Sequence, residues 1–167
     1  MQLGLKDFKR FEKQIILKNV GVAGQKKIIN AKVLIIGIGG LGCPLLTYLA
    51  ASGVGTIGIA DPDKIEISNL NRQTLFTTND IGKYKVDQAK YSINRINNKI
   101  RIKVFKKKIN LKNIKSAIRD FDIICDGTDN FETRYLVNDE CKKMKKILIS
   151  AAISKFDGHL YKFNFKK

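Results

Sequence analysis

The sequence predicts an α/β fold, a doubly wound and mostly parallel sheet covered by helices, in a single domain over residues 1–167. Three observations support this prediction. Short β-rich runs alternate along the chain with segments of helical periodicity. No Pro/Ser-rich linker interrupts them, and a hydrophobic content of 44% is enough for one packed core. A glycine-rich turn follows the first apolar run directly and leads into a helical pattern, which is the strand–turn–helix context that the glycine motif of doubly wound sheets requires.

The elements are expected in a regular order. The expected strands are Lys32–Gly37, Thr56–Ala60, Arg101–Phe105, Phe121–Cys125, Ile147–Ala151 and Leu160–Phe165. The expected helices are Leu41–Ser52, Lys83–Asn97, Leu111–Ile118 and Asn130–Lys143. Because a crossover leads to each of the first five strands, these strands are expected to be parallel with right-handed connections, and the last is expected to be antiparallel.

An N-terminal helical segment, about residues 5–29, precedes the first strand. Its apolar residues recur at helical spacing at Leu5, Phe8, Phe11, Ile15 and Ile16. This pattern predicts an amphipathic helix, which packs either on its own domain or on a neighbouring subunit.

Composition excludes several classes of function. The formal charge of +17 comes from 32 Lys and Arg against 15 Asp and Glu, but it is diffuse and no recognition motif accompanies it, so no nucleic-acid partner is expected. The apolar stretch 41–60 is interrupted by Pro44 and Ser52, and the N-terminus lacks the pattern of a signal peptide. A cytoplasmic protein without a membrane span is expected.

The chain has three cysteines, and they form no CxxC pair: Cys43, Cys125 and Cys141. Neither a disulfide framework nor a zinc site is therefore expected.

The glycine-rich turn carries the first functional signal. Gly37-x-Gly39-x-x-Gly42 follows a buried-strand pattern and opens a helix, so its backbone can approach a phosphate at a helix N-terminus. Asp61 comes nineteen residues after Gly42, where a carboxylate can accept hydrogen bonds from ribose hydroxyls. These features predict a ribonucleotide site. They are shared by ATP-binding proteins and NAD-dependent oxidoreductases.

The segments that follow favour ATP. A triphosphate needs several cations or a metal, and Arg72 and Lys85 meet that demand better than that of a nicotinamide. The fourth strand ends in Asp126-Gly-Thr-Asp-Asn130, which places polar groups at the crevice where parallel sheets bind ligands. Asp129 is well placed there to hold Mg²⁺.

Five features of the sequence occur in the order and spacing of one family: GIGGLG, Asp61, SNLNRQTLF, the lysine of GKYK, and GTDN. Over nearly its whole length the chain resembles the ThiF/MoeB/HesA adenylyltransferases, bacterial relatives of ubiquitin-activating enzymes. The resemblance implies a Rossmann-like fold. It also implies ATP-dependent adenylation, with Mg²⁺, of the C-terminal glycine of a ubiquitin-like sulfur-carrier protein in thiamine or molybdopterin synthesis.

The resemblance also implies the role of each residue. Asp61 would hold the ribose, Arg72 and Lys85 the phosphates, and Asp129 the metal, which makes Arg72, Lys85 and Asp129 the expected catalytic residues. The full set expected at the nucleotide is Gly37, Gly39, Gly40, Gly42, Asp61, Asp63, Ser68, Asn69, Leu70, Asn71, Arg72, Gln73, Lys85, Asp129, Asn130 and Lys13.

Lys13 departs from the family. Relatives carry there an arginine that reaches into the partner subunit's site, within a homodimer. A lysine keeps the charge but loses the bidentate fork.

The end of the chain departs as well. Relatives usually continue into a region with two CxxC zinc pairs, whereas this chain ends at Lys167, so a truncated C-terminus is expected. Two alternatives remain open at this point: a nucleotide-binding or dimerisation module without catalysis, and an NAD-dependent oxidoreductase.

Overall fold

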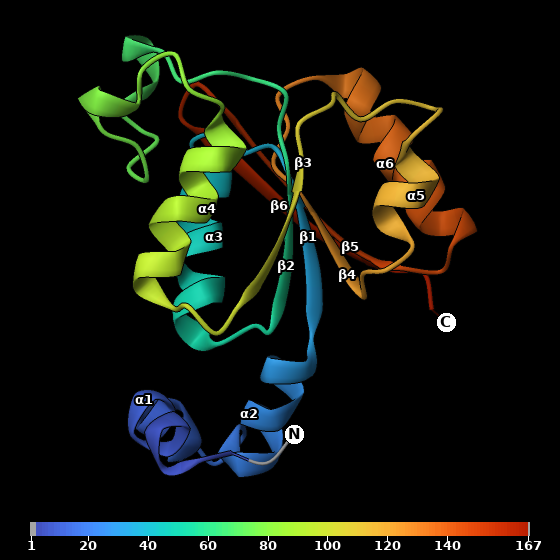
Figure 1. Cartoon of the computed structure of the whole chain (residues 1–167). Helices are drawn as coiled ribbons and strands as arrows, with labels where there is room; N and C mark the ends of the chain where they lie inside the picture. Colours follow the sequence, from blue (N-terminus) through green and yellow to red (C-terminus); the bar gives the residue numbers. More distant parts are fainter. Residues whose placement is uncertain (1–2, 167) are drawn as a thin grey trace.

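The computed structural model describes residues 3–166, and its centre is one six-stranded sheet. The strands are β1 (Lys32–Ile36), β2 (Thr56–Ala60), β3 (Arg101–Phe105), β4 (Ile123–Asp126), β5 (Ile147–Ser154) and β6 (Asp157–Asn164). The helices are α1 (Leu5–Ile15), α2 (Gly21–Asn30), α3 (Gly42–Ser52), α4 (Lys85–Ile96), α5 (Ile114–Ile118) and α6 (Phe131–Lys143). In Figure 1, α3 and α4 cover one face of the sheet, and α5 and α6 cover the other.

The strand order is β3-β2-β1-β4-β5-β6, and the predicted doubly wound topology is confirmed. The first five strands are parallel, with Val33 of β1 between Ile57 of β2 and Ile123 of β4. Only β6 runs antiparallel, against β5. The chain winds outward from β1 through β2 and β3, and then starts again at β4 on the other side of β1. The topological switch point, where open sheets of this kind bind ligands, therefore lies between β1 and β4.

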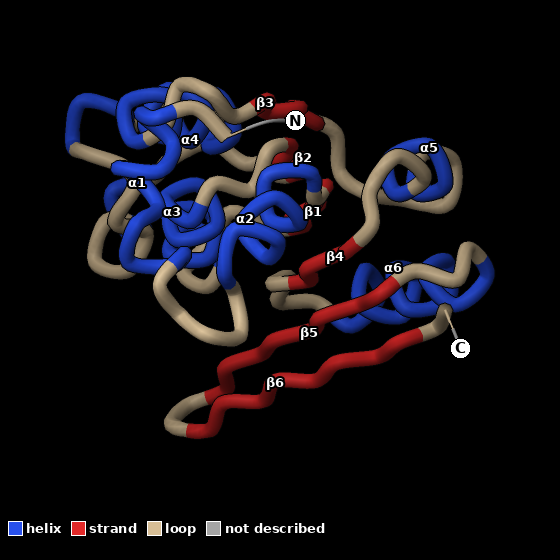
Figure 2. Tube along the Cα trace, turned by 90° about the horizontal axis from the view of Figure 1, so that it is seen from below, coloured by secondary structure: helices blue, strands red, loops and turns tan. Residues whose placement is uncertain are grey.

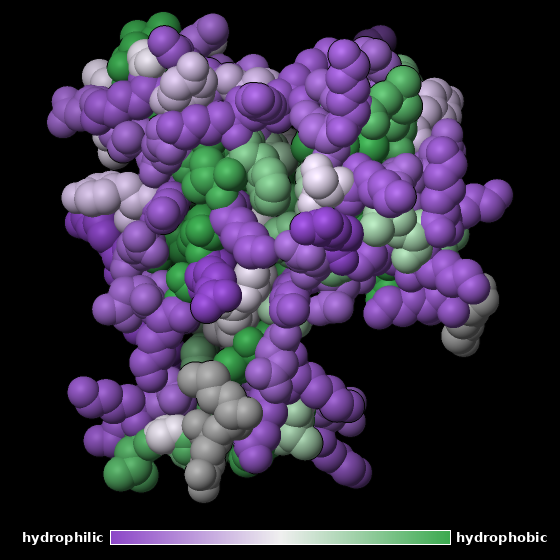
Figure 3. All heavy atoms as spheres, turned by 45° about the vertical axis from the view of Figure 1, so that its right-hand side comes forward, coloured by the Kyte–Doolittle hydropathy of each residue, from purple (hydrophilic) through white to green (hydrophobic). Residues whose placement is uncertain are grey.

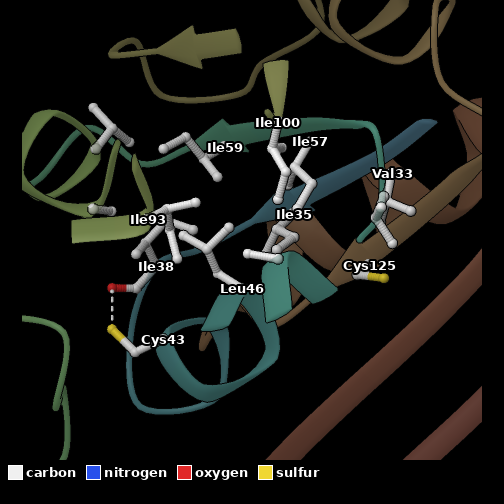
Figure 4. Packing of buried hydrophobic residues seen from close by; sticks show 14 of the residues in the cluster. Val33, Ile35, Ile38, Cys43, Leu46, Ile57, Ile59, Ile93, Ile100 and Cys125 are labelled. Atoms are coloured by element: carbon white, nitrogen blue, oxygen red, sulfur yellow. Dashed lines mark hydrogen bonds between the residues drawn. The ribbon is translucent and has the colours of Figure 1, made fainter. Parts of the chain in front are cut away.

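Two apolar layers hold the helices on the sheet. Ile35, Ile57 and Ile59 point toward α3 and α4, where Leu46 and Ile93 pack against them with no exposed surface (Figure 4). The alternate residues of the strands point the other way and pack with Phe121 and with Val137 of α6 in a second core beneath α5 and α6: Leu34, Ile36, Ile124 and Leu148. Burying each such side chain contributes about 1.5–3 kcal/mol, so both faces of the sheet are firmly covered.

The N-terminal segment forms two helices, α1 and α2, where the periodicity predicted one. Gly21 starts the second at a φ of +57°, a left-handed conformation that glycine adopts without strain. Phe11 of α1 is buried against Gly53, and Lys99 Nζ lies 2.6 Å from a carboxylate oxygen of Asp7. Gln25 of α2 donates to the carbonyl of Ser52 at 3.0 Å. The segment therefore packs on its own domain, at the end of the sheet where β1 begins (Figure 1).

Most element boundaries differ little from prediction, and the larger shifts have local causes. Helix α5 begins at Ile114 and not at Leu111, because the side chains of Asn110 and Asn113 bond backbone N–H groups and form a turn there. Two short 3₁₀ helices, Ile67–Asn69 and Thr78–Asp80, were not predicted.

The β5–β6 hairpin is longer than expected, and β6 is exposed along its whole length. Figure 2 shows it as the outermost strand, opposite β3. Hydrophilic side chains cover most of the face seen in Figure 3, in keeping with the dispersed lysines. Within residues 3–166, none of the helices combines the length and apolar character needed to cross a bilayer.

Candidate functional site

A cleft of about 980 Å³ opens at the carboxyl ends of β1, β2 and β4, beside the topological switch point. Its size is typical of sites that enclose a small ligand. Its walls come from the turn after β1, the segments after β2 and β3, the start of α6 and the end of β5. The predicted residues that line it are Gly37, Gly39, Gly40, Asp61, Asp63, Asn69, Arg72, Gln73, Lys85, Asp129 and Asn130.

The turn after β1 presents bare backbone to this cleft. Gly37 has a φ of +90°. A side chain at Gly42 would place its Cβ 2.0 Å from the carbonyl oxygen of Gly37, so only glycine lets α3 start this close to β1. No described residue accepts a hydrogen bond from the N–H groups of Gly39, Gly40 or Leu41. These donors, at the positive end of the α3 dipole, form an arrangement suited to an anion.

Asp61 is fixed beside this turn. One carboxylate oxygen accepts from the N–H of Ile38 at 2.7 Å, and the other accepts from the N–H of Asp63 at 2.9 Å. Burial raises the pKa of Asp61, while the Asp63 N–H and the charge of Lys85 oppose that rise. The carboxylate thus holds the start of the glycine turn at the end of β2, and each oxygen keeps a lone pair for a further donor such as a ribose hydroxyl.

Lys85 reaches the cleft from the first turn of α4. Its N–H donates to the carbonyl of Asp63 at 3.0 Å, and its ammonium lies 2.9 Å from that residue's carboxylate. The lysine is buried, so its side chain is already ordered before any ligand arrives. This pre-organisation lowers the entropic cost of binding an anionic group.

Arg72 covers the glycine turn from the opposite wall. Its Nη1 donates to the carbonyl of Ser68 at 2.9 Å and to the side-chain oxygen of Asn71 at 3.1 Å. Its aliphatic stem packs over Gly40, where an added Cβ would lie 3.4 Å from Cγ and Cδ. The guanidinium is exposed and keeps donors for a phosphate.

Gln73 lies in the buried wall of the cleft and is 3% exposed. Its Oε1 lacks a hydrogen-bond partner among the described residues, so this acceptor is free.

The segment Gly127–Asn130 forms the floor after β4. Asn130 caps α6, since its side-chain oxygen accepts from the N–H of Thr133 at 2.9 Å. Asp129 is exposed and lines the cleft. Among residues 3–166, no three His, Cys, Asp or Glu side chains are grouped to hold a metal alone. Mg²⁺ that accompanies a nucleotide takes one or two carboxylates together with phosphates and water, and a single Asp129 fits that arrangement.

Some predicted residues do not line the cleft. Gly42 lies beneath it in the packed junction with Gly37. Leu70 packs against the apolar core, and Ser68 and Asn71 direct their side chains to Glu66 and Arg72. These side chains build the loop that carries Asn69 and Arg72. That they contact the nucleotide stays a prediction.

Lys13 is also absent from the cleft of its own chain. Its side chain is exposed on α1. Figure 1 shows that this helix lies at the end of the sheet where β1 begins, opposite to the cleft. A contact with a partner subunit's site stays a prediction.

Other cleft residues were missed. Lys107 and Lys108 enter from the loop after β3, and Thr128, Phe131 and Arg134 from the start of α6 and the loop before it. The strand order carries a signal for the two lysines, because residues that follow parallel strands gather at one edge of the sheet. Arg134 has no such signal, since it comes one helical turn after the loop and its role depends on side-chain contacts.

A ligand cleft at the switch point of a doubly wound sheet, with a bare glycine turn, an acid after β2 and converging cations, defines a Rossmann-like nucleotide-binding domain. The chain belongs to the ThiF family, whose family model matches residues 11–167.

Individual relatives agree with this assignment. The chain is 44% identical over 162 residues to a probable molybdopterin-synthase adenylyltransferase of Porphyra purpurea, covering 97% of this chain and 42% of the relative. It is 40% identical over 155 residues to the sulfur carrier protein adenylyltransferase of Thermus thermophilus, covering 93% of this chain and 57% of the relative. The chain thus spans about half the length of these curated relatives.

Among solved structures, the chain resembles that of E. coli MccB with MccA-N7isoASN. The TM-score is 0.72 and the sequence identity is 35%, over 76% of this chain and 37% of that one.

Proposed function

We propose that this chain is an adenylyltransferase that transfers AMP from ATP to the C-terminal glycine carboxylate of a ubiquitin-like sulfur-carrier protein. One observation carries the proposal: Gly39, Gly40 and Leu41, whose N–H groups bond to none of the described residues, line the same cleft as Arg72, Lys85 and Asp129. The names of the relatives, a molybdopterin-synthase and a sulfur-carrier adenylyltransferase, support AMP transfer over hydride transfer.

The reaction requires the protein only to position the reactants and to stabilise the negative charge on the phosphates. An ionised carboxylate oxygen attacks the α-phosphorus of ATP, the bond to the β-phosphate oxygen breaks, and pyrophosphate leaves with both electrons. Because a carboxylic acid is ionised near neutral pH, no general base is required. The glycine-turn N–H groups, Arg72 and Lys85 then stabilise the charge that develops on the phosphates. Bound Mg²⁺, held by Asp129, would add neutralising charge at the same oxygens.

The carrier and the assembly belong to the same proposal. The carrier ends in Gly-Gly and serves molybdopterin or thiamine synthesis, in the cytoplasm. A homodimer is proposed by resemblance, with Lys13 of one subunit reaching the cleft of the other.

The test is ATP–pyrophosphate exchange with Mg²⁺ and a carrier protein that ends in Gly-Gly. We expect exchange by the wild type and a loss of about 100-fold or more in Asp129→Ala, the scale of losing one electrostatic contact to a transition state. Asp139→Ala is the matched control, because Asp139 is an exposed carboxylate on α6 outside the cleft. ATP binding without exchange would overturn the proposal and leave a nucleotide-binding module without catalysis.

A further inference from the structure

Arg134 lines the cleft, but its guanidinium donates hydrogen bonds to other groups of the protein. Its Nε and Nη2 donate to the carbonyl of Thr128 at 3.0 and 2.6 Å. The same Nη2 also donates to the carbonyl of Ala151, and Nη1 lies 3.5 Å from Ser150 Oγ. One planar guanidinium therefore joins the loop after β4 to the middle of β5.

A second set of contacts, made by the last residue of β4, holds the same loop. Asp126, the last residue of β4, is 3% exposed. One of its carboxylate oxygens accepts from the N–H and the hydroxyl of Thr128, at 3.0 and 2.7 Å. The other accepts from Ser150 Oγ at 2.9 Å. Ser150 thus links the buried carboxylate to the guanidinium, and Thr128 is bound through its N–H, its hydroxyl and its carbonyl.

The contrast with Arg72 shows what this network does. Arg72 bonds the protein through a single nitrogen and leaves the rest of an exposed guanidinium toward the cleft. Arg134 uses all three of its nitrogens on protein acceptors. Four of its five N–H donors are thereby occupied, so a ligand phosphate would have to break a protein bond to gain a bidentate contact with Arg134. Its influence on a ligand therefore passes through the residue that follows Thr128 in the loop, which is Asp129.

We propose that Arg134 is a positioning residue: together with Ser150 and Asp126 it fixes the loop so that the Asp129 carboxylate faces the metal ion of a bound Mg²⁺–nucleotide. The inference rests on the proposed function for the role of Asp129. A lysine at position 134 would keep the charge but could not donate in one plane to two carbonyls, so the loop would lose its orientation while the core stays packed.

The test compares Arg134→Lys and Ser150→Ala with wild type, and uses Arg95→Lys as control, because Arg95 is an exposed arginine on α4 outside the cleft. Calorimetry measures ATP affinity at zero Mg²⁺ and across a Mg²⁺ titration. Thermal unfolding and ATP–pyrophosphate exchange follow on the same samples. We expect both variants to keep wild-type ATP affinity without Mg²⁺, and to need about tenfold more Mg²⁺ for half-maximal enhancement of ATP binding.

The outcomes separate this inference from the proposed function. A wild type that binds Mg²⁺–ATP without exchange defeats the adenylation proposal, yet the Mg²⁺ titrations still test the role of Arg134. Unchanged Mg²⁺ dependence in both variants overturns the inference. So does an equal loss of ATP affinity with and without Mg²⁺, since that pattern marks either a direct contact with the nucleotide or a general loss of structure. Ser150→Ala keeps the test valid where Arg134→Lys fails to fold.

Discussion

The ammonium of Lys85 lies 2.9 Å from a carboxylate oxygen of Asp63, yet the lysine side chain is 7% exposed and the aspartate 61% exposed. Because water around the exposed carboxylate weakens its field, the Lys85 ammonium still attracts anions in the cleft that it lines. The ion pair thereby holds the lysine in place without removing its ability to attract an anion.

Replacing this lysine therefore tests binding more than folding. We expect Lys85→Met to weaken ATP binding about tenfold to a hundredfold, the range for losing a hydrogen bond to a charged group. The unfolding temperature changes little, because water can solvate the exposed Asp63. Isothermal calorimetry measures the affinity. Lys83→Met, two positions earlier and 51% exposed, serves as control, and equal effects of the two variants would contradict the prediction.

The junction of β1 and α3 makes a prediction about stability. Gly42→Ala brings a Cβ to 2.0 Å from the carbonyl of Gly37, so the turn has to shift. We expect a loss of about 1–3 kcal/mol in the free energy of unfolding, the usual cost of overpacking, together with weaker ATP binding. Urea unfolding measures it. Gly158→Ala is the control, because no atom lies within 4 Å of its added Cβ and its effect is expected to stay within about 0.5 kcal/mol.

The attachment of the N-terminal helices has a pH dependence. The hydrogen bond from Lys99 lowers the pKa of Asp7 below its usual 3.8. The folded state therefore binds this proton less readily than the unfolded state, and the stabilisation is present above pH 3.8 and lost as the pH falls through the folded pKa. We expect Asp7→Asn to be less stable than wild type at pH 5–7, with a difference that shrinks below pH 4, in urea unfolding across that range. In a Lys99→Met background most of this difference is expected to vanish, and a difference that persists would refute the account.

The three cysteines are expected to be unreactive in the native chain. Burial raises the pKa of the Cys43 thiol to about 11 and those of Cys125 and Cys141 to about 12. Thiolates are the reactive species, so at pH 8 an aromatic disulfide reagent is expected to label these thiols only as fast as the chain unfolds locally. Guanidinium exposes all three at once. Rapid labelling of any one of them in native buffer would show a reactive thiol that this burial does not explain.

The sequence predicts the sheet well because the signals are local. Each parallel strand is an apolar run between helices, and all six strands lie within a few residues of their expected positions. The glycine turn and Asp61 were predictable for a similar reason: their backbone and spacing requirements show in the order of residues. The split of the N-terminal segment was missed, since a left-handed Gly21 leaves no mark on the apolar pattern.

The missed part of the cleft depends on contacts between distant segments. Lys107 and Lys108 stand out from the other lysines of a lysine-rich chain only once β3 is known to end beside β2. Arg134 acquires its role from carbonyls in two other elements, which no spacing rule specifies. The residues Ser68, Leu70 and Asn71 show the reverse case, because a motif names residues together without separating those that line the cleft from those that shape the loop.

The strand order also sets when this cleft can exist. β1 joins β4 through a ladder that starts with Val33 and Ile123, about 90 residues apart, and ends with Ile36 and Asp126, where the cleft begins. Closing so long a loop is entropically costly, and parallel sheets built from distant segments form slowly. The glycine turn and α3 can form early, but Arg72 and Asp129 come to line one cleft only after the sheet closes. During refolding, the complete cleft is therefore expected only after the β1–β4 pairing has formed.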